Sequence, residues 1–213
     1  MSLLGTLLEK QGGSASRVFG LVVGVVTNNQ DPDGMGRVKV KFPWLSDADE
    51  SFWARIAVLM AGGGRGTWFL PEVDDEVLVG FEHGDVRFPY VVGALWNGQD
   101  APPADNADGK NNLRVIKSRS GHVIKLNDED GKETVEVVDK TGKNSIVIDT
   151  AKNTITVSAD KDITLLAPRG TITLDAQKLE LRSSGDTKIE SGAAMDVKAS
   201  GALTAKGSPI NLN

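Results

Sequence analysis

Residues 153–182 read NTITVSADKDITLLAPRGTITLDAQKLELR. Apolar side chains recur here in pairs whose members lie two residues apart, and successive pairs begin seven to nine residues apart. Two apolar residues that flank a third are typical of a short β-strand with one buried face. A strand every eight or so residues predicts a repeat architecture, which is a stack of very short strands.

The pattern runs from residue 124 to the end of the sequence. Its first intervals are 11, 11 and 9 residues, and the later ones are 7 to 9 residues. We predict that the paired positions line the interior of the repeat. They include Ile124, Leu126, Val135, Val137, Ile146, Ile148, Ile155, Val157, Ile163, Leu165, Ile172, Leu174, Leu179, Leu181, Ile189, Val197 and Leu203.

The repeats cannot form an ordinary core within one chain. Each offers only two medium-sized apolar side chains, and no aromatic residue follows Trp96. Three chains winding together would bring the pairs onto a common axis, with backbone hydrogen bonds running between neighbouring strands. We therefore predict an all-β fold that contains an intertwined triple-stranded β-helix, or β-prism needle, and a homotrimer. A single-chain parallel β-helix and a plain β-sandwich are the alternatives.

Composition excludes several functional classes. The formal net charge is −5, so the chain lacks the basic character of a nucleic-acid-binding protein, and no nucleic-acid partner is expected. The absence of cysteine excludes disulfides and thiolate metal sites. The apolar run at residues 3–8 is too short to span a membrane. We expect residues 1–16 to be an N-terminal docking arm.

Residues 17–98 are predicted to form an OB-fold barrel, followed by a connector and needle root at 99–121 and the spike at 122–213. Short strand patterns separated by turn residues, with no helical pattern among them, suit a small barrel. The strand candidates are Gly20–Val26, Arg37–Phe42, Trp53–Met60, Glu76–Glu82 and Tyr90–Trp96. Asp47–Glu50 and Gly62–Gly66 are expected to be loops.

Several stretches of this region resemble one known family. They are Gly36–Trp44 (GRVKVKFPW), Trp53–Ala57 (WARIA), Phe69–Val73 (FLPEV), Glu76–Asp85 (EVLVGFEHGD), Pro89–Gly93 (PYVVG) and Trp96–Gly98 (WNG). In order and spacing they are similar to the OB domain of the central spike of contractile injection machines. That family includes phage baseplate assembly protein V and the valine-glycine repeat spike of type VI secretion. The resemblance implies an OB domain joined to a trimeric β-prism needle.

The chain departs from the family pattern in ways that shape the expected partners. Asp74 replaces the usual glycine of one turn. Only about 16 residues precede the OB domain, where type VI spikes usually carry a hub domain. The resemblance therefore implies a separate baseplate hub protein at the OB end. The His-x-His motif that closes the tip of many phage spikes is absent, which implies a separate PAAR-like tip protein. The residues expected to bind it are Pro209, Ile210, Asn211, Leu212 and Asn213.

No residue pattern predicts catalysis, a cofactor or a metal. The adjacent carboxylates Asp74, Asp75 and Glu76 could imitate a glycosidase pair but are expected to lie on a solvated turn. His83, Asp85 and Ser51 could be imagined as a catalytic triad, yet nothing in the spacing fixes their geometry. His122 opens the first repeat, and its role stays undecided between an axial ion site and a cap on the needle root.

These features predict a non-enzymatic, homotrimeric spike that pierces a target-cell envelope when a sheath contracts. Such a spike would assemble in the bacterial cytoplasm as part of an injection particle or virion tail and be delivered outward. Two alternatives remain, both on a trimeric β-helical stalk: an OB-fold oligosaccharide-binding module and a carbohydrate-active enzyme. The sequence does not distinguish a phage from a secretion system or a released particle.

Overall fold

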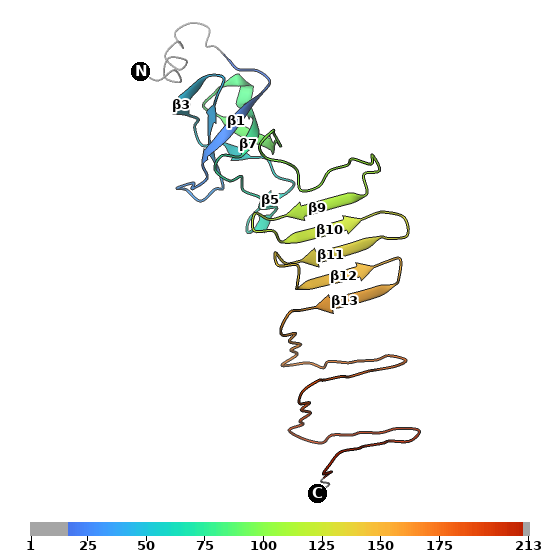
Figure 1. Ribbon diagram of the computed structural model, residues 1–213. Helices are drawn as coiled ribbons and strands as arrows, with labels where there is room; N and C mark the ends of the chain where they lie inside the picture. The colour runs from blue at the N-terminus through green and yellow to red at the C-terminus, as the bar shows by residue number, and fades with distance from the viewer. Residues whose placement is uncertain (1–16, 211–213) are drawn as a thin grey trace. The chain divides into compact units, whose positions relative to one another are not determined.

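The computed structural model describes residues 17–210, apart from the side chains of residues 46–48. The predicted docking arm at 1–16 and the tip residues Asn211, Leu212 and Asn213 lie outside the described residues. Regular structure in the described part is almost entirely β, as Figure 1 shows, and its one helical segment is the short 3-10 turn η2, Glu82–Gly84. The all-β prediction is confirmed.

The first sheet is six-stranded and curls on itself. Its strands are β1 (Leu21–Asn28), β2 (Lys39–Phe42), β3 (Ser46–Glu50), β4 (Arg55–Ile56), β7 (Glu76–Phe81) and β8 (Pro89–Ala94). They lie in the order β3-β2-β1-β7-β8-β4, with only β4 and β8 parallel. An antiparallel bridge between Val38 and Ala54 links the start of β2 to the start of β4. The curled sheet therefore closes toward a barrel, as an OB fold requires.

Valine fills the interior of this barrel. Alternation along β2 and β7 directs every second side chain inward, and the fully enclosed residues are mostly β-branched, which suits a pleated surface. The buried core consists of Val26, Val38, Val40, Phe42, Ala54, Val77, Val79 and Val91. Gly24 faces this core from β1, and a Cβ added there would lie 2.3 Å from a methyl carbon of Val40. Glycine at residue 24 therefore permits the close approach of β1 and β2.

All five strands predicted for this region overlap an observed strand, but two local predictions were wrong. Asp47–Glu50, expected to be a charged loop, belongs to edge strand β3, where Glu50 pairs with Lys39 on β2 at 3.1 Å. Charged side chains are common on edge strands because one side of the strand faces water. The strand expected at Trp53–Met60 shrinks to the two residues of β4. The loop expected at Gly62–Gly66 lies in a hairpin of β5 (Ala61–Gly62) and β6 (Arg65–Gly66).

Asp74 adopts the conformation that the family's glycine would favour. Its φ angle is 76°, in the left-handed region that non-glycine residues seldom occupy. The backbone around it is fixed by hydrogen bonds from the Asp74 amide to Val26 O and from the Val26 amide to Asp75 O, both 2.9 Å. The turn therefore keeps a glycine-like conformation although aspartate occupies it.

Asp74→Gly is expected to stabilise the barrel by about 0.5 kcal/mol, because relief of left-handed strain exceeds the added freedom of the unfolded chain. Chemical denaturation followed by tryptophan fluorescence would measure this change. Asp75→Gly is the matched control: its carboxylate accepts the Glu72 amide at 2.8 Å, and its φ is not positive, so we expect destabilisation there. A destabilising effect of Asp74→Gly would contradict the strain argument.

The second sheet is an antiparallel meander of five strands. Figure 1 shows β9 (Leu113–Lys117), β10 (Val123–Asn127), β11 (Thr134–Val138), β12 (Ser145–Asp149) and β13 (Thr154–Ser158) stacked in sequence order. The first four apolar pairs of the repeat lie on β10 to β13, directly opposite one another: Leu126 faces Val135, for example, and Val137 faces Ile146. In the predicted prism of three wound chains, successive repeats from residue 122 onward would lie on different faces. These four repeats instead pair with one another inside one chain.

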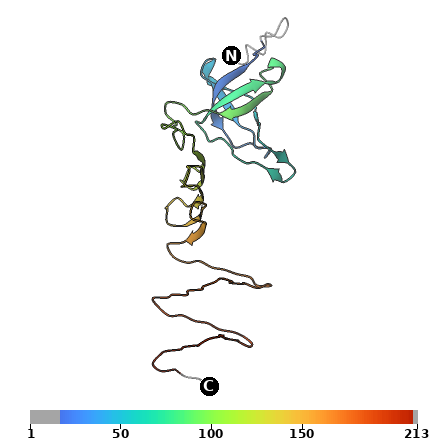
Figure 2. The ribbon, with the colours of Figure 1, turned by 90° about the vertical axis from the view of Figure 1, so that its right-hand side faces the viewer.

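Residues 163–210 lie in a separate unit that begins at Ile163. The chain folds back and forth in both views (Figure 1 and Figure 2), yet no β-strand is assigned between residues 163 and 210. All side chains of this range except Ala167 are exposed, including Ile172 and Leu181, which are 50% and 74% exposed. The predicted apolar pairs of this range therefore have no partner within the described chain.

Candidate functional site

The meander has one apolar face with no covering layer. Strand alternation places the paired residues on one side of the sheet, and β9 adds Ile116 opposite Ile124. We call this surface the apolar face. It consists of Ile116, Ile124, Leu126, Val135, Val137, Ile146, Ile148, Ile155 and Val157, which are all between 37% and 71% exposed. An apolar surface of this extent marks an interaction site in a soluble protein.

The opposite face of the meander carries an ion pair between neighbouring strands. Lys125 and Glu136 lie opposite each other on β10 and β11, with Nζ and Oε2 2.9 Å apart, and Thr134 donates a hydrogen bond to Glu136 at 2.7 Å. Partial burial raises the pKa of Glu136, but the bonds from Lys125 and Thr134 outweigh it and hold that pKa below its usual value. Strand alternation also places five apolar side chains on this face: Leu113, Val115, Val123, Val138 and Val147. This face is therefore mixed, whereas the apolar face carries the paired residues of the repeat.

The turns of the meander explain why the chain reverses there. Between β11 and β12, Asp139 accepts hydrogen bonds from the side chains and backbone amides of Thr141 and Asn144, and Gly142 supplies a left-handed φ of 72°. Hydrogen bonds from Asn144 first, and from Thr141 second, lower the pKa of Asp139 to about 2. A polar turn built in this way needs six residues between strands. The intervals of 11 residues leave room for it.

His122 precedes β10 and is fixed by the neighbouring turn. Its Nδ1 accepts the Lys140 amide at 3.2 Å, and its own amide donates to Ser118 Oγ at 3.0 Å. The Nδ1 lone pair is thus engaged by a backbone amide of the neighbouring turn. Of the two roles considered for His122, these hydrogen bonds favour the structural one, a cap at the root of the sheet.

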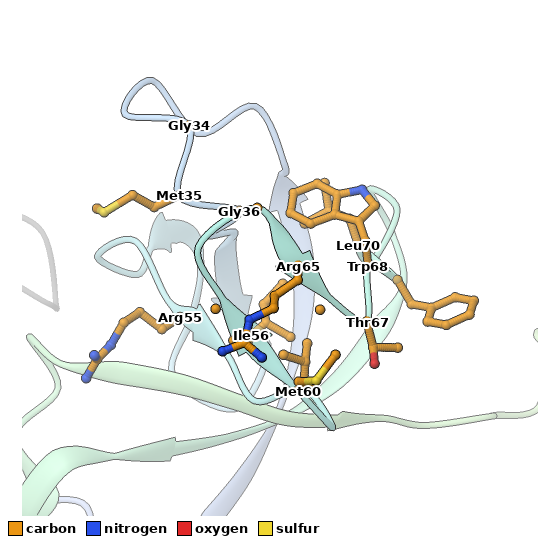
Figure 3. Close-up of a pocket in the computed structure, with 16 residues that line it drawn as sticks. Gly34, Met35, Gly36, Arg55, Ile56, Met60, Arg65, Thr67, Trp68 and Leu70 are labelled. Carbon is orange, nitrogen blue, oxygen red and sulfur yellow. The ribbon is translucent and has the colours of Figure 1, made fainter.

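The barrel carries a second candidate surface, a groove beside the β5–β6 hairpin. Figure 3 shows Met35, Arg55, Met60, Arg65 and Trp68 among the side chains that line it. The Trp68 ring packs on the backbone of residue 36, where a Cβ would lie 2.7 Å from the indole. Trp68 is nevertheless 72% exposed. Aromatic, methionine and arginine side chains are enriched in protein–protein interfaces.

The groove lacks the groups that catalysis needs. Arg55, Arg65 and Thr67 supply the polar side chains of its lining, and no carboxylate, imidazole or serine hydroxyl belongs to it. General acid–base or nucleophilic chemistry requires such a group within hydrogen-bonding reach of a substrate. The groove is therefore suited to binding an apolar or aromatic surface.

The imagined catalytic triad does not exist. Ser51 is buried, and its hydroxyl accepts the Val40 amide at 3.0 Å and donates to Phe52 O at 2.7 Å. Asp85 instead binds Arg87, whose guanidinium holds the pKa of that carboxyl down at about 2. His83 adopts a left-handed backbone conformation in a turn, with a φ angle of 50°. Ser51 serves the barrel as an internal hydrogen-bonding group, a role that its sequence context did not reveal.

Three arginines of the barrel, Arg37, Arg55 and Arg87, lie within 4.0 Å of a carboxylate. Arg37 donates to Asp31 through Nε at 2.9 Å and through Nη2 at 2.6 Å, and it also bonds Asp33. The guanidinium holds the pKa of Asp31 far below its usual range. Arg37 also lies over the ring of Trp53, with its central carbon 5.8 Å from the centroid. These ion pairs offset the charge of the three arginines.

Within residues 17–210, no cluster of three or more potential metal-ligating side chains is found. In the same part of the chain, no helix has the length and apolar character to cross a bilayer.

The barrel matches a known domain family. Residues 22–96 match the type VI secretion system/phage-baseplate injector OB domain. This range contains all six strands of the curled sheet except Leu21 at the start of β1.

Three curated relatives are type VI secretion system spike proteins. VgrG1b of Pseudomonas aeruginosa is 29% identical over 128 residues, or 57% of this chain, and VgrG5 of the same organism is 34% identical over 135 residues, also 57%. VgrG3 of Vibrio cholerae is 37% identical over 82 residues, or 37% of this chain. The chain spans only 16%, 17% and 8% of the lengths of these relatives, respectively. Residues 22–96 therefore match the OB domain of the type VI secretion and phage-baseplate injector family, and between 37% and 57% of the chain is similar to these three spike proteins.

Proposed function

We propose that this chain is the membrane-piercing central spike of a contractile injection machine. In this proposal three copies assemble: their OB domains form a collar on a baseplate hub protein, and their repeats form an intertwined needle. Contraction of the surrounding sheath then drives the needle through a target-cell envelope. The similarity to spike proteins and the injector OB domain support the spike role.

One observation supports the trimer: nearly every repeat of residues 163–210 has an apolar pair, yet no β-ladder forms in this range and its side chains, Ala167 apart, are exposed. Leu174, Leu179 and Val197, for example, are 63%, 56% and 64% exposed. Unpaired backbone amides and carbonyls that are kept from water cost free energy, so extended segments need neighbouring strands. Two further chains running between the segments would supply a strand on each side, about 4.8 Å away. The same arrangement would bury the apolar pairs on the axis.

The meander fits the root of this needle. Three meanders that direct their apolar faces inward would form a three-sided prism with a dry interior. A closed prism leaves no free strand edges along its sides, so local opening is costly and the rod resists axial load. Mechanical stiffness, with no chemical step, is the property that piercing demands.

We propose that the groove beside the β5–β6 hairpin contributes to docking on the hub. Its exposed Met60, Trp68 and Phe69 are 49%, 72% and 65% exposed and would be buried by such contact. At the other end, we propose that residues 209–213 bind a PAAR-like tip protein. Ile210, the described apolar residue of that repeat, is 49% exposed and would be covered.

The proposed spike has no enzymatic activity and acts in an injection particle or virion tail that assembles in the bacterial cytoplasm. The groove without acid–base groups and the structural use of Ser51 support this assignment. The alternative of a carbohydrate-active enzyme would require a convergent pair of acids, whereas Asp75 is engaged with the Glu72 amide.

Deletion of the gene in the source bacterium tests the proposal. We expect particles that fail to assemble or to deliver into target cells, with full rescue by the wild-type gene. Electron microscopy of purified particles and a target-cell killing assay would supply the two readouts. Normal particles and normal delivery without the chain would refute the spike role.

A further inference from the structure

Three consecutive repeats of the needle carry an alternating pattern of charge. Their apolar pairs begin at Leu179, Thr187 and Met195, at intervals of eight residues. Charged residues occupy the positions beside and between the paired residues. The first repeat has Lys178, Glu180 and Arg182, and the second has Asp186, Lys188 and Glu190. The third has Asp196 and Lys198. We call these eight side chains the charge rows.

Within each repeat, the charges lie on one side of the extended chain. Lys178 and Arg182 both pair with Glu180. In the second repeat, Lys188 Nζ lies 2.5 Å from Glu190 Oε1, and in the third Lys198 Nζ lies 3.8 Å from Asp196 Oδ2. Side chains two residues apart share one face of a strand, so each repeat presents a row of alternating sign on the face opposite its apolar pair.

The geometry of three wound chains decides which rows become neighbours. In such a needle, each repeat moves the chain to the next face of the prism and up by one strand spacing. Each face is then built from strands of all three chains in turn. The strand directly above repeat n of one chain is therefore repeat n + 1 of another chain. All strands then run parallel, so a residue lies beside the residue eight positions later in the neighbouring chain. This step rests on the trimeric needle proposed above.

We propose that the charge rows form an interchain checkerboard that sets the register of the three chains. At an offset of eight residues, Lys178 lies beside Asp186, Glu180 beside Lys188, and Arg182 beside Glu190. The next step places Lys188 beside Asp196 and Glu190 beside Lys198. Every neighbour is opposite in charge, both along a strand and across strands, and each cross-strand pair occurs three times by symmetry.

Other registers lose this complementarity. At an offset of 16 residues Glu180 would lie beside Asp196, and Arg182 beside Lys198, so like charges would face each other directly. In a single-chain β-helix with three repeats per turn, Glu180 would stack on Thr156 and Thr204 and meet no charge. The charge rows therefore favour an intertwined trimer in one register, while the apolar pairs, which are similar in every repeat, do not distinguish registers.

Disulfide trapping tests the register, because the chain contains no cysteine. The variant Glu180→Cys/Lys188→Cys places the two sulfurs on adjacent strands, where Cα atoms about 5 Å apart permit a disulfide. Under mild oxidation we expect a covalent trimer on a non-reducing gel, since each chain would join the next in a closed ring. Glu180→Cys/Asp196→Cys, two repeats apart, is the matched control and should remain largely uncrosslinked.

Light scattering on the same samples separates this inference from the proposed function. A trimer that crosslinks through residues 180 and 196 but not through 180 and 188 would overturn the register and leave the spike role standing. Glu180→Cys/Thr204→Cys crosslinked within a monomer would reject both, because it would indicate a single-chain β-helix.

Charge reversal tests whether the charges determine the register's stability. Lys188 would have four acidic neighbours in the checkerboard, namely Asp186 and Glu190 in its own strand and Glu180 and Asp196 in other chains. We expect Lys188→Glu to lower the melting temperature of the trimer more than Lys188→Gln does, and 1 M NaCl to remove most of that difference. Equal melting of the two variants at low salt would refute the checkerboard.

Discussion

Ile172→Asp is expected to abolish trimer formation, whereas Thr173→Asp should leave the trimer intact. In the proposed needle, residue 172 faces the axis and residue 173 faces water, as strand alternation requires. Three copies of the substituted residue would bring three carboxylates together in a dry interior. Desolvation costs several kcal/mol for each ion, and no counter-charge is available in an interior of isoleucine, leucine and valine.

Analytical ultracentrifugation and thermal melting by circular dichroism would compare the two variants. Ile172→Asp should sediment as a monomer or as disordered aggregates, and Thr173→Asp as the wild type does. If the two substitutions had the same effect, the assignment of inside and outside positions in the repeat would be wrong.

Gly24→Ala should destabilise the barrel by about 2 kcal/mol, because the interior has no space for the added methyl group. The Cβ would lie 2.3 Å from Val40 Cγ1 and 3.1 Å from Lys41 O. Val40 is fully buried, and Gly24 is fixed between β2 and β7, where it pairs with Val77. Relief of the clash between the added Cβ and Val40 would therefore require β1 and β2 to separate.

Tryptophan fluorescence would measure unfolding of the barrel separately from the repeats, because every aromatic residue precedes residue 97. Gly93→Ala on β8 is the matched control, because a Cβ there meets nothing within 4 Å. We expect urea denaturation to shift for Gly24→Ala and to stay near the wild type for Gly93→Ala. An unchanged midpoint for Gly24→Ala would show that β1 and β2 are less closely packed than described.

The sequence predicted the barrel strands well where one face of a strand is buried. In β2 and β7, alternating valines report directly which side faces the core. Edge strand β3 gave no such signal, because its composition, Ser-Asp-Ala-Asp-Glu, resembles a loop. The hairpin of β5 and β6 was easier to locate, because glycines mark its turn, although both of its two-residue strands are exposed.

The repeat pattern predicted which residues form the apolar stripe but not how the chain connects them. Ile124 and Ile172 occupy the same kind of position, yet Ile124 lies in an antiparallel meander and Ile172 in an unpaired extended segment. Intervals of 11 residues accommodate a strand of five and a polar turn of six, such as the turn held by Asp139, and the interval of nine between β12 and β13 still permits pairing. Intervals of about eight leave about three residues between strands, and the chain does not pair with itself there.

Among the candidate chemical groups, sequence alone could not separate structural from reactive roles. Ser51 and His122 are each fixed by backbone hydrogen bonds from residues 11 and 18 positions away, respectively. Such contacts depend on how strands and turns meet in space, and no local pattern around either residue indicates them.

The mass of the purified chain in solution tests the central claim most directly. Size-exclusion chromatography coupled to light scattering should give about 68 kDa, three times the chain mass of 22.6 kDa. A mass that stays at three chains on dilution would agree with apolar pairs buried on a shared axis. A folded, stable monomer of 22.6 kDa would contradict the intertwined needle, and with it the account of how this spike is built.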